Sequence, residues 1–90
     1  MATVYVLHRV ENFEKWRHVY DSVGEMQKSG GAVEEAVFRA EEDPDNVLVM
    51  HRFDSMSDAH TYFENPLLVE AVREAGVDES TVRLEFYEEA

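Results

Sequence analysis

Two apolar runs of the chain carry nearly the same residues, and a His-Arg pair stands at the same place in both. The runs are VYVLHRV at residues 4–10 and VLVMHRF at residues 47–53. Both are rich in β-branched and aromatic residues, which predicts β-strands. Side chains alternate between the two faces of a strand, and in both runs the residues of either face are largely apolar. This indicates strands that are covered on both faces. The repeat therefore predicts two equivalent central strands of one sheet.

The length of the chain limits how those strands can be covered. Ninety residues favour one domain that spans residues 1–90. A chain of this size contains too little helix to cover both faces of a sheet, and small domains often gain stability by association. We therefore expect a second copy of the chain to cover the second face, which makes the protein a homodimer.

The remaining elements follow from periodicity and from capping and turn residues. Asn12 is a plausible N-cap for a helix whose inner positions recur at helical spacing and include Trp16, Tyr20 and Gln27. This helix ends at Gly30-Gly31, and a second helix begins after Ser55 or Ser57 and is interrupted at Asn65-Pro66. The expected strands are residues 3–10, 33–40, 46–53 and 81–88, and the expected helices are residues 13–29, 56–64 and 66–75.

The order β-α-β-β-α-β predicts an α+β, ferredoxin-like sandwich, with a four-stranded antiparallel-rich sheet and helices on one face. In this arrangement we expect strands 3–10 and 46–53 to be parallel neighbours at the centre of the sheet. His8 and His51 would then end adjacent strands on one face, within side-chain reach of each other. Arg9 and Arg52 would point to the opposite face, because side chains alternate along a strand.

Composition excludes several classes of function. The net charge of −12 argues against binding to nucleic acid or to anionic membranes, which needs clustered Lys and Arg. The absence of cysteine rules out disulfides and Cys-based zinc sites. We find no Gly-rich phosphate loop, nucleophile elbow or His-Glu-x-x-His helix. No run approaches the roughly 20 apolar residues of a membrane helix, and no signal peptide is recognisable, so we expect a cytoplasmic protein.

Three segments that together cover nearly the whole chain carry a resemblance to a known group of proteins. They are NFEKWRHVYDS at 12–22, EDPDNVLVMHRFDSMSDAHTYF at 42–63 and NPLLVEAVREAGV at 65–77. The chain resembles the small members of the dimeric α/β-barrel superfamily, which includes antibiotic biosynthesis monooxygenase-like proteins. The resemblance implies a homodimer whose two sheets face each other, and a ligand pocket between the sheet and the helices of each subunit. Proteins with this fold include monooxygenases, cyclases, isomerases and proteins with no known role, and those with oxygenase activity work without flavin or metal, so we expect no cofactor.

The two histidines of the repeat, His8 and His51, are the first candidates for chemistry. Three interpretations are open. They are hydrogen-bonded structural side chains, or they line a pocket where one acts as a general base near neutral pH. In the third, they hold a divalent metal together with Glu11 or Asp54, or one of them binds haem.

An aromatic stripe on the inner helix faces is the second candidate. Its members are Trp16, Tyr20, Tyr62 and Phe63. Such a stripe is the ordinary core face of an amphipathic helix. It is also suited to form a flat wall against a small aromatic or hydrophobic ligand, with polar groups supplied by Tyr and Trp.

The opposite face of the sheet is the expected dimer interface. Arg9, Arg52, Arg83 and Tyr87 belong to it by alternation. We expect the arginines to pair there with Glu35 and Glu85, in ion pairs that fix the register of the two subunits.

These features leave three hypotheses for function. The first is a cofactor-independent monooxygenase, or a cyclase or isomerase, that acts on an aromatic or ketide-like substrate with His8 and His51 as catalytic residues. The second is a non-catalytic dimeric binding protein of the same fold, and the third is a metal or haem binder.

Overall fold

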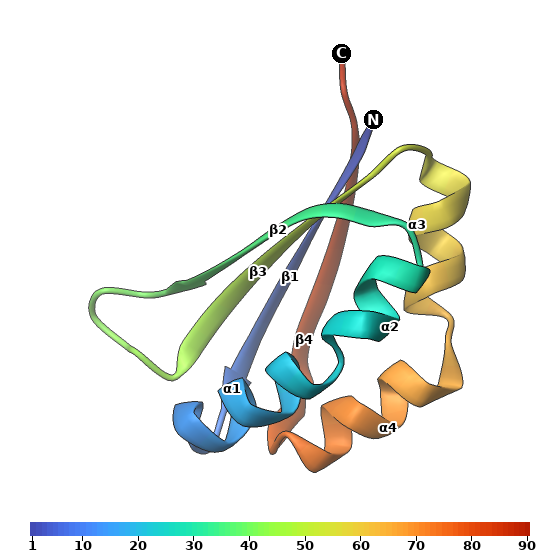
Figure 1. The fold of residues 1–90 in the computed structure, drawn as a ribbon. Coiled ribbons are helices and arrows are strands. Elements are labelled where there is room, and N and C mark those ends of the chain that lie inside the picture. The colour runs from blue at the N-terminus through green and yellow to red at the C-terminus, as the bar shows by residue number, and fades with distance from the viewer.

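A computed structural model describes residues 1–90 and contains one four-stranded sheet with helices on one face (Figure 1). The strands are β1 (Ala2–Val10), β2 (Ala32–Arg39), β3 (Asn46–Phe53) and β4 (Val77–Glu88). The helices are α1 (Phe13–Ser22), α2 (Gly24–Ser29), α3 (Met56–Phe63) and α4 (Pro66–Glu74). The predicted ferredoxin-like fold is confirmed, with each helical region divided into two helices.

The sheet order is β2-β3-β1-β4, and every neighbouring pair is antiparallel. The prediction that the two His-Arg strands are parallel neighbours is therefore wrong. The physical reason lies in the connections. The helical crossover after β1 brings β2 into the sheet in the same direction as β1, and the tight β2–β3 connection then reverses the chain. Since β3 lies between β1 and β2, it runs antiparallel to both.

The reversal separates the two histidines. His8 pairs with Val47 and Val4 pairs with His51, so both histidines lie on one face but four positions apart along the strands. At about 3.3 Å per residue this separation is roughly 13 Å. The expected direct contact between the two imidazoles is therefore absent, although they still share the face that the helices cover.

Two small apolar clusters hold the helices against the sheet. One consists of Ala2, Val4, Phe53, Ala59 and Tyr62, and the other of Val10, Trp16, Val47, Val49 and Ala75. The first joins α3 to one end of β1 and β3, and the second joins α1 to the other end. The covered face of the sheet is therefore packed at both ends, and the space between the two clusters is available for a site.

Capping side chains set most of the helix starts. The Asn12 side chain accepts a hydrogen bond from the Lys15 N–H at 3.0 Å, as predicted. Ser55, rather than Ser57, caps α3 by accepting from the Asp58 N–H at 3.1 Å. Asn65 caps α4 by accepting from the Leu67 N–H at 2.9 Å, directly before the proline at the first helical position.

The first helical region is not continuous, in contrast to the prediction. α1 ends at Ser22 and α2 begins at Gly24, with Val23 between them at φ −99° and ψ 14°. The Ser22 hydroxyl donates a 2.6 Å hydrogen bond to the Val19 carbonyl, so it competes with the helical backbone pattern. Val23 and Gly24 are both poor helix formers, which favours a break at this point.

β4 begins four residues earlier than predicted, directly after Gly76 at φ 74°. Its first residues, Val77 and Asp78, pair with Val10 and Arg9. The polar run Asp78 to Ser80 resembles a turn in the sequence, because Asp and Ser are common turn residues. Pairing with β1 overrides that local preference.

None of the helices has the length and apolar character that crossing a membrane requires.

Candidate functional site

A cavity of about 320 Å³ lies between the helix-covered face of the sheet and the helices. Thirteen of its 17 lining residues are hydrophobic. This size is at the lower end of the range for small-molecule sites, and a mostly apolar lining with a few polar groups is typical of them. All six residues predicted for catalysis or substrate binding line the cavity: His8, Trp16, Tyr20, His51, Tyr62 and Phe63.

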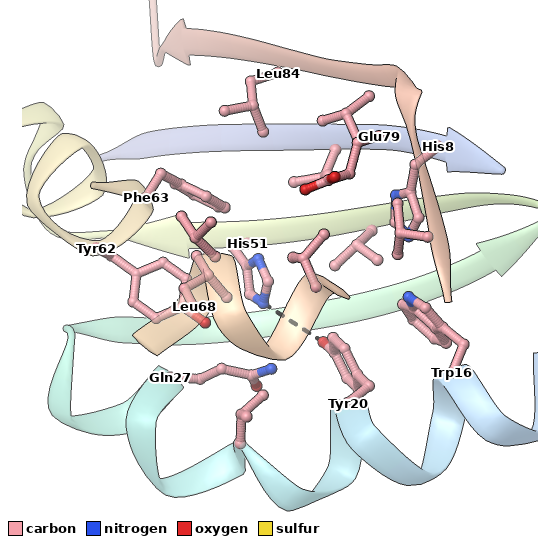
Figure 2. A pocket seen from close by; sticks show the side chains of 17 residues that line it. His8, Trp16, Tyr20, Gln27, His51, Tyr62, Phe63, Leu68, Glu79 and Leu84 are labelled. Carbon is pink, nitrogen blue, oxygen red and sulfur yellow. Dashed lines mark hydrogen bonds between the residues drawn. The ribbon is translucent and has the colours of Figure 1, made fainter. Parts of the chain in front are cut away.

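The labelled side chains enter the cavity from several elements (Figure 2). His8 and Trp16 lie at one end, Tyr62 and Phe63 at the other, and His51 lies between them, next to Tyr20. A run of aromatic rings connects the two histidines. The ring centroids are 5.6 Å apart for His8 and Trp16, 4.9 Å for Trp16 and Tyr20, and 6.3 Å for Tyr20 and His51. The stripe thus forms a wall of the cavity as well as part of the core.

His8 is 5% exposed, and neither of its ring nitrogens has a hydrogen-bond partner. Burial lowers the pKa of His8 from 6.5 to about 4, so the imidazole is neutral at neutral pH. A neutral imidazole offers one donor and one acceptor. Buried polar atoms of this kind are normally hydrogen-bonded, so His8 brings unused hydrogen-bonding capacity to its end of the cavity.

His51 is 4% exposed, and burial lowers its pKa from 6.5 to about 4, an effect that nearby Glu35 opposes. Its Nε2 lies 3.5 Å from the Tyr20 hydroxyl oxygen, and its Nδ1 has no partner. A neutral imidazole can accept a proton, which is the first requirement of a general base. His51 therefore combines the proton-accepting state with one uncommitted nitrogen.

Two tyrosine rings lie beside this imidazole, with centroids 6.3 Å away for Tyr20 and 5.8 Å away for Tyr62. The Tyr20 hydroxyl donates a 2.7 Å hydrogen bond to a Glu35 carboxylate oxygen, and burial together with this carboxylate raises the pKa of Tyr20. The Tyr62 hydroxyl has no partner, and burial raises the pKa of Tyr62 to about 12. Both hydroxyls therefore remain protonated at neutral pH, and that of Tyr62 has no acceptor within the protein.

Three further residues at or beside the cavity were not predicted to belong to the site. Gln27 is 6% exposed and lines the cavity, and its helical spacing from Tyr20 was the available signal. Glu79 is the one charged residue of the lining, but it lies in the polar run that resembled a turn. Glu35 was assigned to the opposite face of the sheet, and that assignment is wrong. A bulge between Ala32 and Glu34 shifts the alternation of β2 by one residue.

The arginines and Tyr87 lie on the uncovered face of the sheet, as alternation predicted. Here it is Glu34, one residue before the predicted Glu35, that pairs with Arg52 at 2.9 Å. Arg52 also lies 3.6 Å from Glu89, Arg9 pairs with Asp43, and Arg83 pairs with Glu85 at 2.7 Å. Tyr87 is 51% exposed and packs edge-to-face on Tyr5 at 5.7 Å.

The structure contains no group of three or more His, Cys, Asp or Glu side chains that could hold a metal ion. Glu11 and Asp54, which were considered as ligands beside the histidines, therefore form no such group with them.

No protein-family model matches the sequence, and no functionally curated protein matches it. Solved structures do match over the whole chain. A candidate antibiotic biosynthesis monooxygenase from Bordetella bronchiseptica has a TM-score of 0.80 at 8% identity, and the match covers 99% of this chain and 96% of that one. One from Deinococcus radiodurans has a TM-score of 0.70 at 15% identity, with 100% and 93% covered.

A third structure is SnoaB from Streptomyces nogalater, described as a cofactor-independent oxygenase. It matches with a TM-score of 0.76 at 8% identity, and the match covers 99% of this chain and 91% of that one. The chain has the fold of the antibiotic biosynthesis monooxygenase-like proteins. Identities of this size establish the fold and leave the activity to be argued from the site.

Proposed function

We propose that this protein is an enzyme that oxidises a small aromatic or ketide-like substrate with molecular oxygen and without a cofactor. The observation that carries the proposal is a mostly apolar, aromatic-walled cavity containing two buried neutral imidazoles with unpartnered nitrogens. The fold shared with SnoaB, described as a cofactor-independent oxygenase, supports the same class of reaction.

The lining of the cavity favours a planar, mostly apolar ligand. The rings of Trp16 and Tyr20 lie 4.9 Å apart at 20° on one wall, and aliphatic side chains of α4 and β4 complete the lining. Flat rings stack well on such a wall. The buried polar groups without a partner are His8, His51 and the Tyr62 hydroxyl, and Gln27 and Glu79 also line the cavity. A phenol or an enolisable carbonyl compound offers the hydroxyl and carbonyl groups that these partners can bind.

The reaction begins with the transfer of a substrate C–H proton to the free nitrogen of His51. The resulting carbanion, delocalised over the adjacent ring or carbonyl, gives up electrons to oxygen, and a C–O bond forms. The imidazolium returns its proton to the peroxide oxygen. Loss of water, which carries away the second proton of the carbon, leaves a carbonyl group. The sum is CH₂ plus O₂ to C=O plus H₂O, with the substrate carbon oxidised and oxygen reduced.

The same base would serve a cyclase or isomerase, which moves a proton or closes a ring without consuming oxygen. The choice of an oxygenase rests on the apolar lining, which admits oxygen and holds few charged groups: Glu79 is the one charged residue of the lining. In a binding protein without activity, the imidazoles would only form hydrogen bonds with the ligand.

Oxygen uptake with anthrone-type phenols tests the proposal. We expect wild-type protein to consume one O₂ per quinone formed, and His51→Gln to lower the rate by about 100-fold or more, the scale of general-base catalysis. His18→Gln, on the exposed surface of α1, is the matched control and should keep the wild-type rate. Product formed without oxygen uptake would identify a cyclase or isomerase, and ligand binding without any product would identify a binding protein.

We also propose that two copies associate through the uncovered face of the sheet. That face carries Leu7, Tyr5, Leu48, Met50 and Phe38 in addition to the arginines, and Phe38 is 52% exposed. Apolar side chains in such number on one face favour burial against a partner. A homodimer would satisfy the two-sided apolar character of β1 and β3, and would leave the cavity on the outer side of each sheet.

A further inference from the structure

Three side chains from three elements form a line from the surface of the protein to the cavity. Glu35 of β2 is exposed, Tyr20 of α1 is half-buried, and His51 of β3 is buried. The Tyr20 hydroxyl is 2.7 Å from Glu35 Oε2 and 3.5 Å from His51 Nε2. Figure 2 marks the second of these contacts with a dashed line. The hydroxyl thus bridges a surface carboxylate and a buried imidazole.

The backbone brings these groups together. Glu35 is the direct cross-strand partner of His51, so their side chains share one face of the sheet. The bulge between Ala32 and Glu34 turns Glu35 toward the helices, whereas Glu34 points to the other face and pairs with Arg52. The Tyr20 ring lies 6.3 Å from the His51 ring at 22°, nearly parallel to it.

The direction of the first hydrogen bond determines the second. A tyrosine hydroxyl has one proton, and a carboxylate only accepts, so the Tyr20 proton points to Glu35. Hydrogen bonds to ionised acceptors are also roughly twice as strong as neutral ones. Toward His51 the hydroxyl oxygen therefore presents only lone pairs, so a hydrogen bond between these two groups needs a proton on Nε2.

A neutral imidazole carries one proton, so a proton on Nε2 leaves Nδ1 as a bare lone pair. Nδ1 has no other partner that would oppose this tautomer. The 3.5 Å contact is longer than an ordinary N–H···O hydrogen bond. Hydrogen bonds of catalytic groups are often long before the ligand binds and shorten in the complex.

We propose that Glu35 is a positioning residue, which acts through Tyr20 to hold the proton of His51 on Nε2 and to keep Nδ1 free as the base. Its catalytic meaning rests on the proposed function, in which that nitrogen accepts the substrate proton. The tautomer itself is a property of the protein without substrate, so it can be measured independently of any activity.

Nitrogen NMR of protein labelled at histidine tests the proposal, because the protonated and bare ring nitrogens have well-separated shifts. At neutral pH we expect wild-type His51 to carry its proton on Nε2. In Glu35→Ala the Tyr20 hydroxyl loses its carboxylate and turns to the nearest acceptor, Nε2, so the proton of His51 should move to Nδ1. Glu34→Ala removes a neighbouring exposed carboxylate from the opposite face, and should keep the wild-type tautomer.

A second variant keeps the test decisive. Tyr20→Phe removes the bridging hydroxyl, so we expect the Nε2 preference to give way to a mixture of both tautomers. Glu35 is exposed, so its replacement should not unfold the protein. Wild-type His51 with its proton on Nδ1 would overturn the proposal. So would a Glu35→Ala or a Tyr20→Phe variant that keeps the wild-type tautomer.

Kinetics separate this proposal from the proposed function. Where wild-type protein consumes oxygen, Glu35→Ala should lower kcat by about tenfold to 100-fold with little change in KM. The reason is that the variant keeps the imidazole but shifts its proton to Nδ1, the nitrogen that acts as the base. Glu34→Ala should keep both constants. Wild-type protein without oxygen uptake would contradict the proposed function, while the NMR result would still decide the role of Glu35.

Discussion

His8 and His51 lie on the same face of the sheet and line the same cavity, yet the register places them four positions apart. Trp16 and Tyr20 fill the space between their rings. The two imidazoles are thus parts of one site without being a pair. One of them has a hydroxyl neighbour that sets its tautomer, and the other has two uncommitted nitrogens.

The first prediction is that the two histidines titrate independently. At roughly 13 Å two charges interact weakly, and more weakly still in salt, because the Debye length is about 8–10 Å. In His8→Ala the His51 titration should match the wild type, and the reverse should hold in His51→Ala. Histidine NMR titrations between pH 3 and 8 would measure this. A shift of the remaining midpoint by a whole pH unit would show that the two groups are coupled.

The second prediction concerns stability below neutral pH. Burial lowers the pKa of both histidines to about 4, whereas the unfolded chain has the ordinary value of 6.5. Between pH 4 and pH 6.5 the histidines are protonated in the unfolded state but largely unprotonated in the folded state. Each histidine therefore contributes nothing unfavourable above pH 6.5, and destabilises the fold progressively as the pH falls from 6.5 toward 4, by on the order of 3–4 kcal/mol in full.

Urea unfolding of wild type, His8→Phe and His51→Phe at pH 7 and pH 5 measures this effect. The wild type should lose more unfolding free energy between the two pH values than either variant, because each variant lacks one of the groups that titrate there. The carboxylates are common to all three proteins and cancel in the comparison. Equal losses in all three would contradict the prediction.

The third prediction concerns the cavity. Val72→Phe on α4 places an aromatic ring in the space that the ligand would occupy, since Val72 lines the cavity and is only partly buried. We expect binding of an apolar fluorescent probe to weaken at least about tenfold, with a change in unfolding free energy under about 1 kcal/mol. Leu67→Phe, at an exposed position of the same helix outside the lining, is the control. Equal probe affinity in both variants would show that the probe binds elsewhere.

The fourth prediction concerns the proposed dimer. Tyr87→Asp places a charge on the uncovered sheet face beside Tyr5, and burial of an unpaired charge in an interface is costly. We expect the dissociation constant measured by sedimentation to rise at least about 100-fold. Leu67→Asp on α4, on the opposite side of the molecule, should leave it unchanged. A wild-type protein that sediments as a monomer at high concentration would contradict the dimer itself.

Arg52 gives a separate test of the same face. In one protomer its side chain is 31% exposed and its partners Glu34 and Glu89 are more exposed, so the pairs contribute only about 0–1 kcal/mol there. In a dimer that covers these ion pairs, Arg52→Met would leave two buried carboxylates without a partner, at a cost of about 3–5 kcal/mol. Unfolding measured at two protein concentrations distinguishes the cases, because only the covered pair makes the loss depend on concentration.

The sequence by itself determined the order of the elements, the two faces of β1 and β3, and the fold class. Periodicity placed β3 at its observed limits, Asn12 caps the first helix as predicted, and Asn65-Pro66 interrupts the second helical region as predicted. Because side chains alternate along a strand, adjacent His and Arg residues were predicted on opposite faces of β1 and β3, where the structure has them. These features could be predicted because each depends on neighbours within a few residues, where spacing and capping chemistry act directly.

Only the tertiary structure decided how those elements meet. The direction of β3 against β1 depends on the crossover and the hairpin together, and it separates His8 from His51. The bulge in β2, which pairing with β3 creates, brings Glu35 rather than Glu34 to Tyr20. The cavity exists because two separate clusters support the helices at either end of the sheet. Register, bulges and voids result from contacts between residues far apart in the chain, so no local pattern encodes them.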